Sequence, residues 1–274
     1  MSDEIEAGSE DSFEGLDVQA LALPDCPRCA GSGYISEEDG GALPRQYLCP
    51  CVLASRQQAV ASSRVETIFG TGGARMTVSS YQTGGMEENE LALACAKNYV
   101  QYWPRFKEEG AGFALQGPPG AGKTHLTTGT MIALIKRWDV KPFHLSVPEM
   151  LRLARKRFDD PKTADVLDRA MTADLYLLDD IGAEYHKDHG GGMSWVDEQL
   201  FVILNYRLTQ GLPTIYTTNL SQRELRDRLD DRVSRRLATA TLAFLPLKPV
   251  QQAQQSSPEL KQLLLQGDGS KTVS

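Results

Sequence analysis

The feature that most constrains the fold is a glycine-rich loop at residues 117–124, which reads GPPGAGKT. It follows an apolar stretch typical of a strand, GFALQG, and opens a stretch with helical periodicity, KTHLTTGTMIALIKRW. A GxxxxGK[ST] loop in this position turns backbone N–H groups and a helix N-terminus toward phosphate oxygens. The sequence therefore predicts a nucleoside triphosphate site on an α/β domain.

Each position of this loop has an expected role. Its glycines permit the tight turn, the Lys123 ammonium reaches the β and γ phosphates, and the Thr124 hydroxyl ligates Mg²⁺. The residues expected to contact the nucleotide are Gly117, Pro118, Pro119, Gly120, Ala121, Gly122, Lys123, Thr124 and His125. The alternative is a glycine-rich turn with a chance lysine, which the flanking strand and helix disfavour.

A second apolar stretch, LYLLDD at 175–180, ends in two carboxylates. Asp179 is expected to hold Mg²⁺ and Asp180 to polarise the attacking water. Aspartate is one methylene shorter than the glutamate that most such enzymes use, so we expect slow ATP hydrolysis that a partner or DNA stimulates. Alternatively, the two aspartates cap the strand end. Glu184 is either an outer carboxylate of the site or a surface acid.

A third apolar stretch, PTIYTTN, ends in Asn219. An amide at the tip of a parallel strand can orient the hydrolytic water or contact the γ-phosphate, although asparagine also often closes a strand into a turn. FHLSV at 143–147 and ATLAFLPL at 240–247 complete a set of strands that alternate with helical patterns. The predicted fold is α/β, with five parallel strands flanked by helices. Only 26 residues follow Lys248, too few for a helical C-terminal lid.

Composition and charge exclude several classes of protein. With 41% hydrophobic and 24% charged residues, the chain is typical of a globular protein, and no apolar run approaches the ~18 residues of a membrane span. The net charge of −7 disfavours unspecific coating of nucleic acid. Residues 1–17 carry seven acidic and no basic side chains and lack the pattern of a signal peptide, so we expect a cytoplasmic protein.

Four of the five cysteines lie in one short segment, as CxxC at 26–29 and CxC at 49–51. Four thiolates are the number that a closed structural Zn²⁺ site needs, so Zn²⁺ is expected on Cys26, Cys29, Cys49 and Cys51. A redox pair is disfavoured because there is no room for a thioredoxin-like domain. The acidic interior of the segment disfavours DNA contact and favours protein recognition. Cys95 is expected in the core.

These patterns divide the chain into five segments. They are an acidic tail (1–22), a zinc-binding module (23–56), a linker (57–75), an ATPase domain (76–248) and a flexible tail (249–274). A shorter stretch inside them, 52–64, has the pattern of a helix.

The combination of GPPGAGKTHL, LLDDIGAE, YTTNL and DDRVSRRL resembles the AAA+ ATPases of the helicase-loader group, DnaC and DnaI, with the transposition helper IstB as a relative. The resemblance covers residues 65–248. It implies ATP, Mg²⁺, subunits that assemble on single-stranded DNA, and a DnaB-type replicative helicase as partner. It also implies that the zinc module engages this helicase.

The resemblance gives roles to arginines. It implies self-association in which Arg232 and Arg236 act in trans, Arg236 reaching the γ-phosphate of a neighbouring subunit. Arg235 stands where the family usually has Ser or Asp, so the choice between Arg235 and Arg236 stays open. Arg207 is a weaker candidate for an interface cation. A solvated basic helix face is the alternative.

Candidate DNA contacts come from two places. The helix pattern LRLARKRF carries Arg155 and Phe158 at the spacing that family members use, and the loop EYHKDHGGG offers Lys187 beside Tyr185 and His189. Cations for phosphate and an aromatic ring for base stacking suit single-stranded DNA. A core phenylalanine and a solvated loop are the alternatives.

The leading hypothesis is an ATP-dependent helicase loader. An IstB-like transposition helper would share the ATPase motifs and typically carries a cysteine-free N-terminal domain, so the cysteines favour the loader. A third possibility is an ATP-binding switch or clamp that hardly hydrolyses ATP, which Asp180 keeps open.

Overall fold

The computed structural model describes residues 17–37, 45–149, 152, 165–182 and 195–250. In chain order the elements are α1 (Val18–Leu21), β1 (Tyr34–Glu37), β2 (Arg45–Leu48), α2 (Pro50–Gly73), η2 (Val78–Ser80), α3 (Glu87–Gln101), α4 (Trp103–Glu108), β3 (Gly112–Gln116), α5 (Lys123–Trp138), β4 (Pro142–Ser146), α7 (Asp165–Thr172), β5 (Leu175–Ile181), α8 (Trp195–Thr209), β6 (Thr214–Thr218), α9 (Gln222–Arg228), α10 (Asp231–Ala240) and β7 (Thr241–Pro246). Within the described parts of the chain, no helix is both long and apolar enough to cross a membrane.

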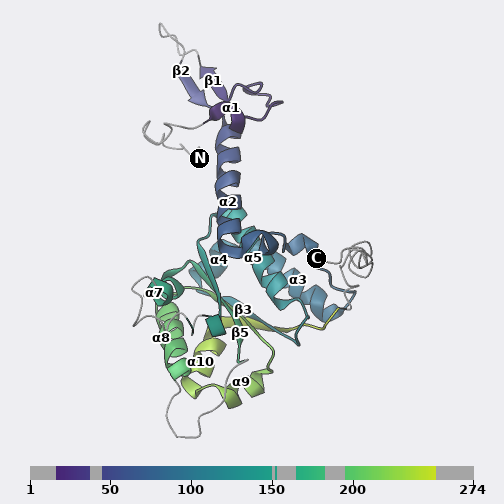
Figure 1. The fold of residues 1–274 in the computed structure, drawn as a ribbon, viewed down its shortest axis with the longest axis vertical. Helices are drawn as coiled ribbons and strands as arrows, with labels where there is room; N and C mark the ends of the chain where they lie inside the picture. The colour runs from purple at the N-terminus through teal and green to yellow at the C-terminus, as the bar shows by residue number, and fades with distance from the viewer. Residues whose placement is uncertain (1–16, 38–44, 150–151, 153–164, 183–194, 251–274) are drawn as a thin grey trace, which may run out of the picture.

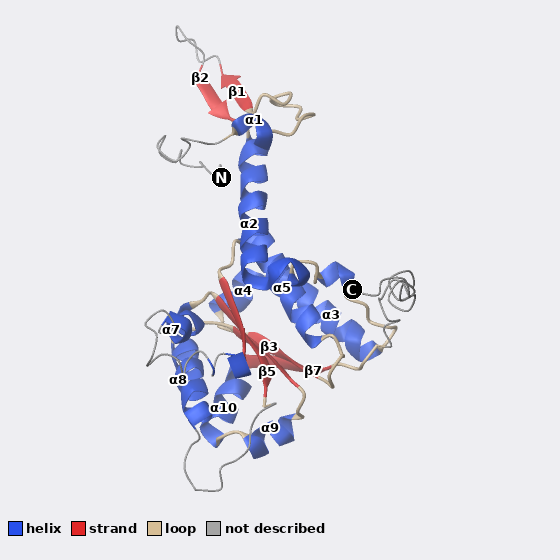
Figure 2. Cartoon of the chain, viewed as in Figure 1, coloured by secondary structure: helices blue, strands red, loops and turns tan. Residues whose placement is uncertain are grey.

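The central sheet has five strands in the order β4-β5-β6-β3-β7, and every neighbouring pair is parallel. The predicted five-stranded parallel sheet is therefore confirmed (Figure 2). Because the strands are parallel, the ends of β3, β5 and β6 meet at one edge of the sheet. That edge brings together the loop after β3 and the carboxylates of β5.

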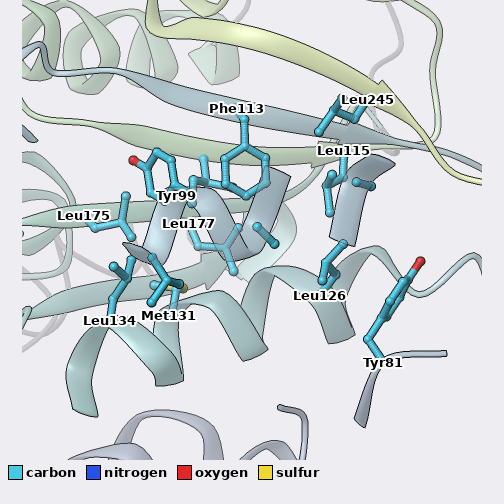
Figure 3. Packing of buried hydrophobic residues seen from close by; sticks show 14 of the residues in the cluster. Tyr81, Tyr99, Phe113, Leu115, Leu126, Met131, Leu134, Leu175, Leu177 and Leu245 are labelled. Atoms are coloured by element: carbon cyan, nitrogen blue, oxygen red, sulfur yellow. The ribbon is translucent and has the colours of Figure 1, made fainter. Parts of the chain in front are cut away.

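Helices cover both faces of the sheet, so its strands are apolar on both sides. Alternate residues of one strand serve the two faces: Phe113 and Leu115 pack with α3 and α5 (Figure 3), whereas Ala114 belongs to the core on the other face. The second face is covered by α7, α8 and α10. The edge of the sheet that carries the glycine-rich loop is thus anchored between two hydrophobic cores.

The helix α2 is longer than the sequence predicted and runs through the segment 57–75 that we expected to be a linker. Its apolar residues Ala61 and Val65 pack against Ile132 and Ile135 of α5, which extends helical order beyond residue 64. The helix breaks only at Gly70, whose φ of 67° is readily adopted by glycine. In Figure 1, α2 projects from the domain that contains the five-stranded sheet and carries the cysteine segment at its far end.

The cysteine module is small. It consists of α1, the antiparallel hairpin β1–β2 and the start of α2, and its core has five buried residues, Ala22, Cys26, Cys29, Cys49 and Val52. The helix α1 lies in the segment 1–22 that we assigned to the acidic tail, so the ordered module begins earlier than residue 23. Three of the five core residues are cysteines, which leaves little apolar area for stability.

Candidate functional site

The glycine-rich loop connects β3 to α5 at the carboxyl edge of the sheet. Gly120 and Gly122 have φ angles of 79° and 83°, which side chains disfavour. A Cβ atom on Gly122 would lie 2.8 Å from the Tyr81 ring, so this residue also permits the close packing of Tyr81 on the loop. The helix α5 begins at Lys123 with its N-terminus toward the loop.

Lys123 is held at the centre of the loop and is 6% exposed. Its Nζ donates hydrogen bonds to the carbonyl oxygens of Gly117 (2.8 Å) and Pro118 (3.2 Å) and to Asn219 Oδ1 (2.6 Å). Burial lowers the pKa of Lys123, although the charges of Asp180 and Asp179 oppose this shift. The end of β6 and the loop after β3 are therefore joined through one ammonium group.

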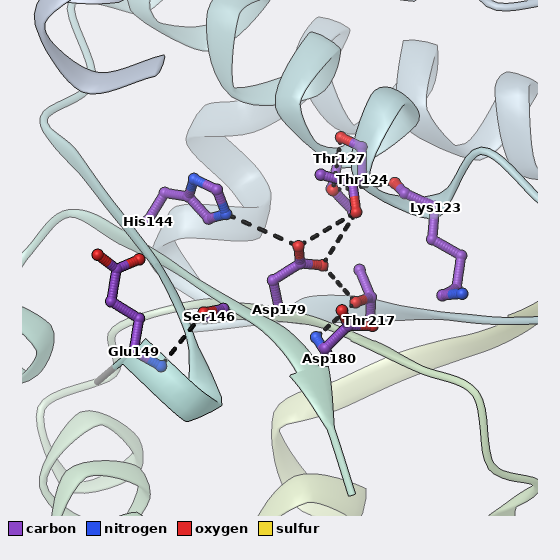
Figure 4. A network of polar contacts seen from close by, with 9 residues as sticks. All are labelled: Lys123, Thr124, Thr127, His144, Ser146, Glu149, Asp179, Asp180 and Thr217. Carbon is purple, nitrogen blue, oxygen red and sulfur yellow. Dashed lines mark hydrogen bonds and ion pairs between the residues drawn. The ribbon is translucent and has the colours of Figure 1, made fainter. Parts of the chain in front are cut away.

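Asp179 lies among three polar side chains from three other elements (Figure 4). Its carboxylate accepts hydrogen bonds from the hydroxyls of Thr124, at 3.1 Å, and Thr217, and His144 Nε2 lies 3.9 Å from Oδ2. Burial would raise the pKa of Asp179, but these neighbours outweigh it and lower that pKa below its usual value. An ionised carboxylate beside a threonine hydroxyl is an oxygen donor set that suits Mg²⁺.

Asp180 has a different environment from its neighbour. It is a non-glycine residue with a φ of 57°, at the point where the pairing of β5 with β6 shifts register, and its backbone N–H donates to Thr217 Oγ1 at 2.9 Å. Burial and then the charge of Asp179 raise its pKa. Two adjacent carboxylates whose pKa values are pushed apart suit different roles, a metal ligand and a base.

The residues that sequence reasoning missed are Thr217, His144 and Tyr81. Thr217 lies in the predicted strand that ends at Asn219. Nothing in the sequence around it indicates that its hydroxyl faces the Asp179 carboxylate of a neighbouring strand. His144 comes from β4, and only the parallel pairing of β4 with β5 brings it near Asp179. Tyr81 lies in the segment before α3 and packs on the glycine-rich loop, but no sequence motif marks this segment.

His125 contacts that segment. Its Nε2 lies 3.0 Å from Ser80 Oγ and 3.1 Å from the carbonyl oxygen of Thr77, and its ring meets Tyr81 edge-on with centroids 5.7 Å apart. The side chain that we expected at the nucleotide is thus tied to η2 and the residues beside it. Its contact with nucleotide stays a prediction.

Arg207 is not an interface cation, because it is 0% exposed. Its guanidinium donates to Thr214 Oγ1 and to four carbonyl oxygens, those of Ala170, Met171, Ala173 and Pro213. Burial lowers its pKa to about 10. A sequence pattern cannot distinguish this buried clamp from a surface arginine on the same helix.

The arginines of α10 lie beside α8. Arg236 donates from Nε to Asn205 Oδ1 at 3.0 Å, and its guanidinium lies 5.4 Å from the centroid of the Phe201 ring. Arg232 lies over the same ring at 5.8 Å and pairs with Asp230. Arg232 and Arg236, four residues apart, therefore both contact the Phe201 ring, whereas Arg235 is exposed.

The four cysteine sulfurs of the module form one cluster. All are free thiols, their sulfurs lie within 4.8 Å of one another, and Cys26–Cys49 and Cys29–Cys51 are each 3.6 Å apart. Tetrahedral Zn²⁺ with Zn–S bonds of ~2.3 Å requires S···S distances of about 3.8 Å, so the cluster fits this ion. Backbone N–H groups of Arg28 and Cys29 lower the pKa of Cys26, whereas burial and the neighbouring thiols raise the pKa of Cys49, so the fit to Zn²⁺ rests on the geometry of the four sulfurs.

The predicted DNA contacts Arg155, Phe158 and Lys187 lie outside the described residues, as do Glu184, Tyr185 and His189. Of the basic helix pattern, Arg152 is described. It is exposed and lies 3.9 Å from Glu149.

Comparison with known proteins agrees with this geometry. The family described as IstB-like ATP binding protein matches residues 104–248, just over half of the chain. The replicative helicase loader DnaI of Bacillus subtilis (strain 168) is 32% identical over 137 residues, which are 49% of this chain and 42% of that protein. The chain thus matches less than half the length of this relative.

Solved structures show the same fold. The crystal structure of the DnaC helicase loader superposes with a TM-score of 0.56 at 24% identity, covering 65% of this chain and 99% of that one. The crystal structure of DnaI superposes with a TM-score of 0.54 at 26% identity, covering 64% of this chain and 92% of that one. These matches show that about two thirds of this chain has the fold of those proteins.

Proposed function

We propose that the chain, which belongs to the family of IstB-like ATP-binding proteins, is an ATP-dependent loader of a replicative DNA helicase. Its AAA+ core binds ATP, and the cysteine module binds a DnaB-type helicase hexamer. ATP binding and hydrolysis control assembly and release. The observation that carries the proposal is the pairing of this core, 32% identical to a helicase loader, with a four-cysteine module held away from the ATP site.

The surface of the module supports a role in protein binding. Tyr34 and Tyr47 of its hairpin are 43% and 44% exposed, and Leu23 and Leu53 are exposed as well. Tyr34 and Tyr47 lie on opposite faces of the hairpin, so each face presents an exposed aromatic ring, a kind of side chain that is enriched where proteins bind one another. Zn²⁺ on the four thiolates would hold this surface in shape, since the module has a small core of its own.

The ATP site supports slow hydrolysis. We assign Lys123 to the β and γ phosphates, Thr124 and Asp179 to Mg²⁺, and Asp180 to the attacking water. Bound Mg²⁺ would offset phosphate charge. We assign Asn219, whose Oδ1 lies 2.6 Å from the Lys123 ammonium, to the γ-phosphate as well. The raised pKa of Asp180 favours it as a base, whereas its short side chain limits its reach, which predicts stimulation by a partner or DNA.

The α10 arginines support action between subunits. We propose that Arg236, ordered by Asn205 and Phe201 together with Arg232, supplies a cation to the γ-phosphate of a neighbouring subunit. Arg235 is the alternative, and its exposure keeps that choice open. Single-stranded DNA is proposed to lie along Arg155, Phe158 and Lys187. All of these steps take place in the cytoplasm in our proposal.

The test mixes the purified full chain with the replicative helicase of its source organism or host. Size-exclusion chromatography with light scattering should detect a complex in the presence of ATP and Zn²⁺. Cys26→Ser should abolish the complex, whereas Cys95→Ser, outside the cluster, should retain it. A complex that survives both Cys26→Ser and metal chelation would contradict the role of the module.

The second candidate is a transposition helper, which the matching family itself favours. A transposition helper would bind a transposase rather than a helicase, and the same chromatography with each partner separates the two functions. An ATP switch with little turnover is separated by comparing ATP turnover of the wild type and Asp180→Glu, each with and without single-stranded DNA. A switch stays inactive in the wild type under both conditions.

A further inference from the structure

His144 lies between the ATP site and the helix α2. Its Nε2 atom is buried, has no hydrogen-bond partner among the residues described, and lies 3.9 Å from Asp179 Oδ2. This distance is too long for a hydrogen bond, and a buried polar atom without one is unfavourable. The imidazole therefore faces the carboxylate assigned to Mg²⁺ and is within a small shift of a hydrogen bond to it (Figure 4).

Phe69 contacts His144 from α2. The two ring centroids are 5.7 Å apart with an interplanar angle of 32°. Phe69 is the last residue before the break at Gly70, so it lies at the end of the regular part of the helix. The imidazole is thus placed between an aromatic ring of α2 and the Asp179 carboxylate of β5.

The lower part of α2 is fixed on α5, the helix that begins at Lys123. Val65 of α2 packs against Ile132 and Ile135 of α5, and Arg64 forms an ion pair with Asp139 at the end of α5. A helix held by an apolar contact and an ion pair defines the position of its side chains. The docking of α2 on α5 therefore fixes the position of the Phe69 ring against His144.

The same helix begins at the cysteine cluster. Cys49 is its N-cap residue and Cys51 lies in its first turn. At a rise of ~1.5 Å per residue, Cys51 and Phe69 are roughly 27 Å apart along one helix. One continuous element therefore carries two of the four sulfurs at its start and the support of His144 at its end.

We propose that Phe69 and His144 form a positioning pair that orients the Asp179 carboxylate, and that α2 thereby couples the cysteine module to Mg²⁺ binding at the ATP site. Thr124 and Thr217 restrain this carboxylate by hydrogen bonds, and His144 lies on a further side of it, within a small shift of a third hydrogen bond. Residues that orient a metal ligand from outside the coordination sphere set its affinity for the metal. The inference rests on the proposed function in one respect, that Asp179 holds Mg²⁺.

The test measures binding of a fluorescent ATP analogue to the full chain while Mg²⁺ is titrated. His144→Ala and Phe69→Ala should each raise the Mg²⁺ concentration for half-maximal binding by about tenfold, and neither should change the affinity measured in EDTA. The double variant should show no larger shift than a single one, because the two residues act in series. His144→Gln, which retains a donor, should recover part of the loss.

The matched control is Ile68→Ala, which removes apolar volume from the same turn of α2 and belongs to the cluster on α5 rather than to the His144 contact. It should leave the Mg²⁺ midpoint unchanged. Phe69→Leu retains apolar volume without an aromatic ring and replaces Phe69→Ala if that variant unfolds. Equal midpoints for His144→Ala, Phe69→Leu and the wild type, or additive shifts in the double variant, would overturn the positioning role.

Coupling to the module is tested by Cys26→Ser. This change should raise the Mg²⁺ midpoint in the wild-type background and leave it unaltered in the His144→Ala background, since His144 is the link. An unchanged midpoint in both backgrounds would overturn the coupling. If the wild type bound the analogue without any dependence on Mg²⁺, the role of Asp179 in the proposed function would itself be wrong, a result distinguishable from failure of the pair alone.

Discussion

The ATP site and the cysteine module are ordered in different ways. The ATP site lies at the edge of a sheet buried between two cores, and its polar groups are held by hydrogen bonds among themselves. The hydrophobic core of the module has five buried residues, three of them cysteines that would also bind the metal. In one region the functional groups sit on a fold that exists without them, whereas in the other they are much of what holds the fold together.

This difference teaches where function can be separated from stability. Removing a functional group of the ATP site should abolish chemistry and leave the core folded. Removing a ligand of the module should unfold the module, because folds of this size need a metal or disulfides in place of a large core.

The largest expected effect is that of metal removal on the module. Structural Zn²⁺ contributes an apparent binding free energy of about 10–16 kcal/mol in zinc-finger peptides, so chelation or Cys26→Ser should unfold residues 17–37 and 45–49. Hydrogen exchange should show loss of protection there and unchanged protection in β3, β5 and β6. Cys95→Ser is the control. If the β1–β2 hairpin kept its protection from hydrogen exchange without metal, the claim that the metal holds the module together would be wrong.

The second effect concerns the contribution of Arg207 to the free energy of unfolding of the ATPase domain. Arg207→Met leaves four buried carbonyl oxygens without their donor and should destabilise the domain by about 3–5 kcal/mol. Urea unfolding measures it. Arg223→Met, at a side chain that is 88% exposed, should change stability by no more than about 0.5 kcal/mol. Equal stabilities of the two variants would contradict the clamp.

The third effect separates function from fold at the ATP site. Lys123→Ala removes a buried cation from the phosphate loop and should cost about 2–5 kcal/mol of nucleotide binding, roughly 30-fold or more in affinity. Binding of a fluorescent ATP analogue measures the loss, and circular dichroism should show a folded domain. The exposed Lys136 on the same helix provides the control variant, Lys136→Ala. If Lys123→Ala unfolded the domain, the claim that a functional group of the ATP site can be removed without loss of the fold would be wrong.

The smallest effect concerns the amide at the end of β6. Asn219→Ala should slow ATP hydrolysis by about tenfold, or 1.4 kcal/mol in the barrier, because its side chain is placed beside the phosphate end of the site. Nucleotide affinity should stay within about threefold, or roughly 0.7 kcal/mol. Single-turnover kinetics and equilibrium binding separate the two. A loss of affinity with unchanged turnover would assign Asn219 to binding instead.

Much of the fold and of the ATP site could be predicted from the sequence. The strands follow from apolar runs, and the loop at 117–124 and the carboxylates of β5 are brought together by parallel strand order alone. Local patterns specify these features because each lies within a few residues of a strand end. The same holds for the cysteines, whose spacing predicts the cluster of four sulfurs that the structure shows.

The rest depends on long-range packing that a local pattern does not encode. His144 reaches Asp179 through the pairing of β4 with β5, and Phe69 reaches His144 through the docking of α2 on α5. The expected linker at 57–75 is helical for the same reason, since its apolar residues find partners far along the chain. Arg207 has the sequence context of a surface arginine, and only the fold buries it.

The central claim is that the module binds the helicase while the ATP site controls its loading. The direct measurement is the amount of replicative helicase loaded on closed single-stranded DNA circles by the wild type, Cys26→Ser and Lys123→Ala, with helicase binding measured alongside. We predict that both variants fail to load and that Lys123→Ala alone still binds the helicase. Loading by Cys26→Ser at the wild-type level would contradict the account.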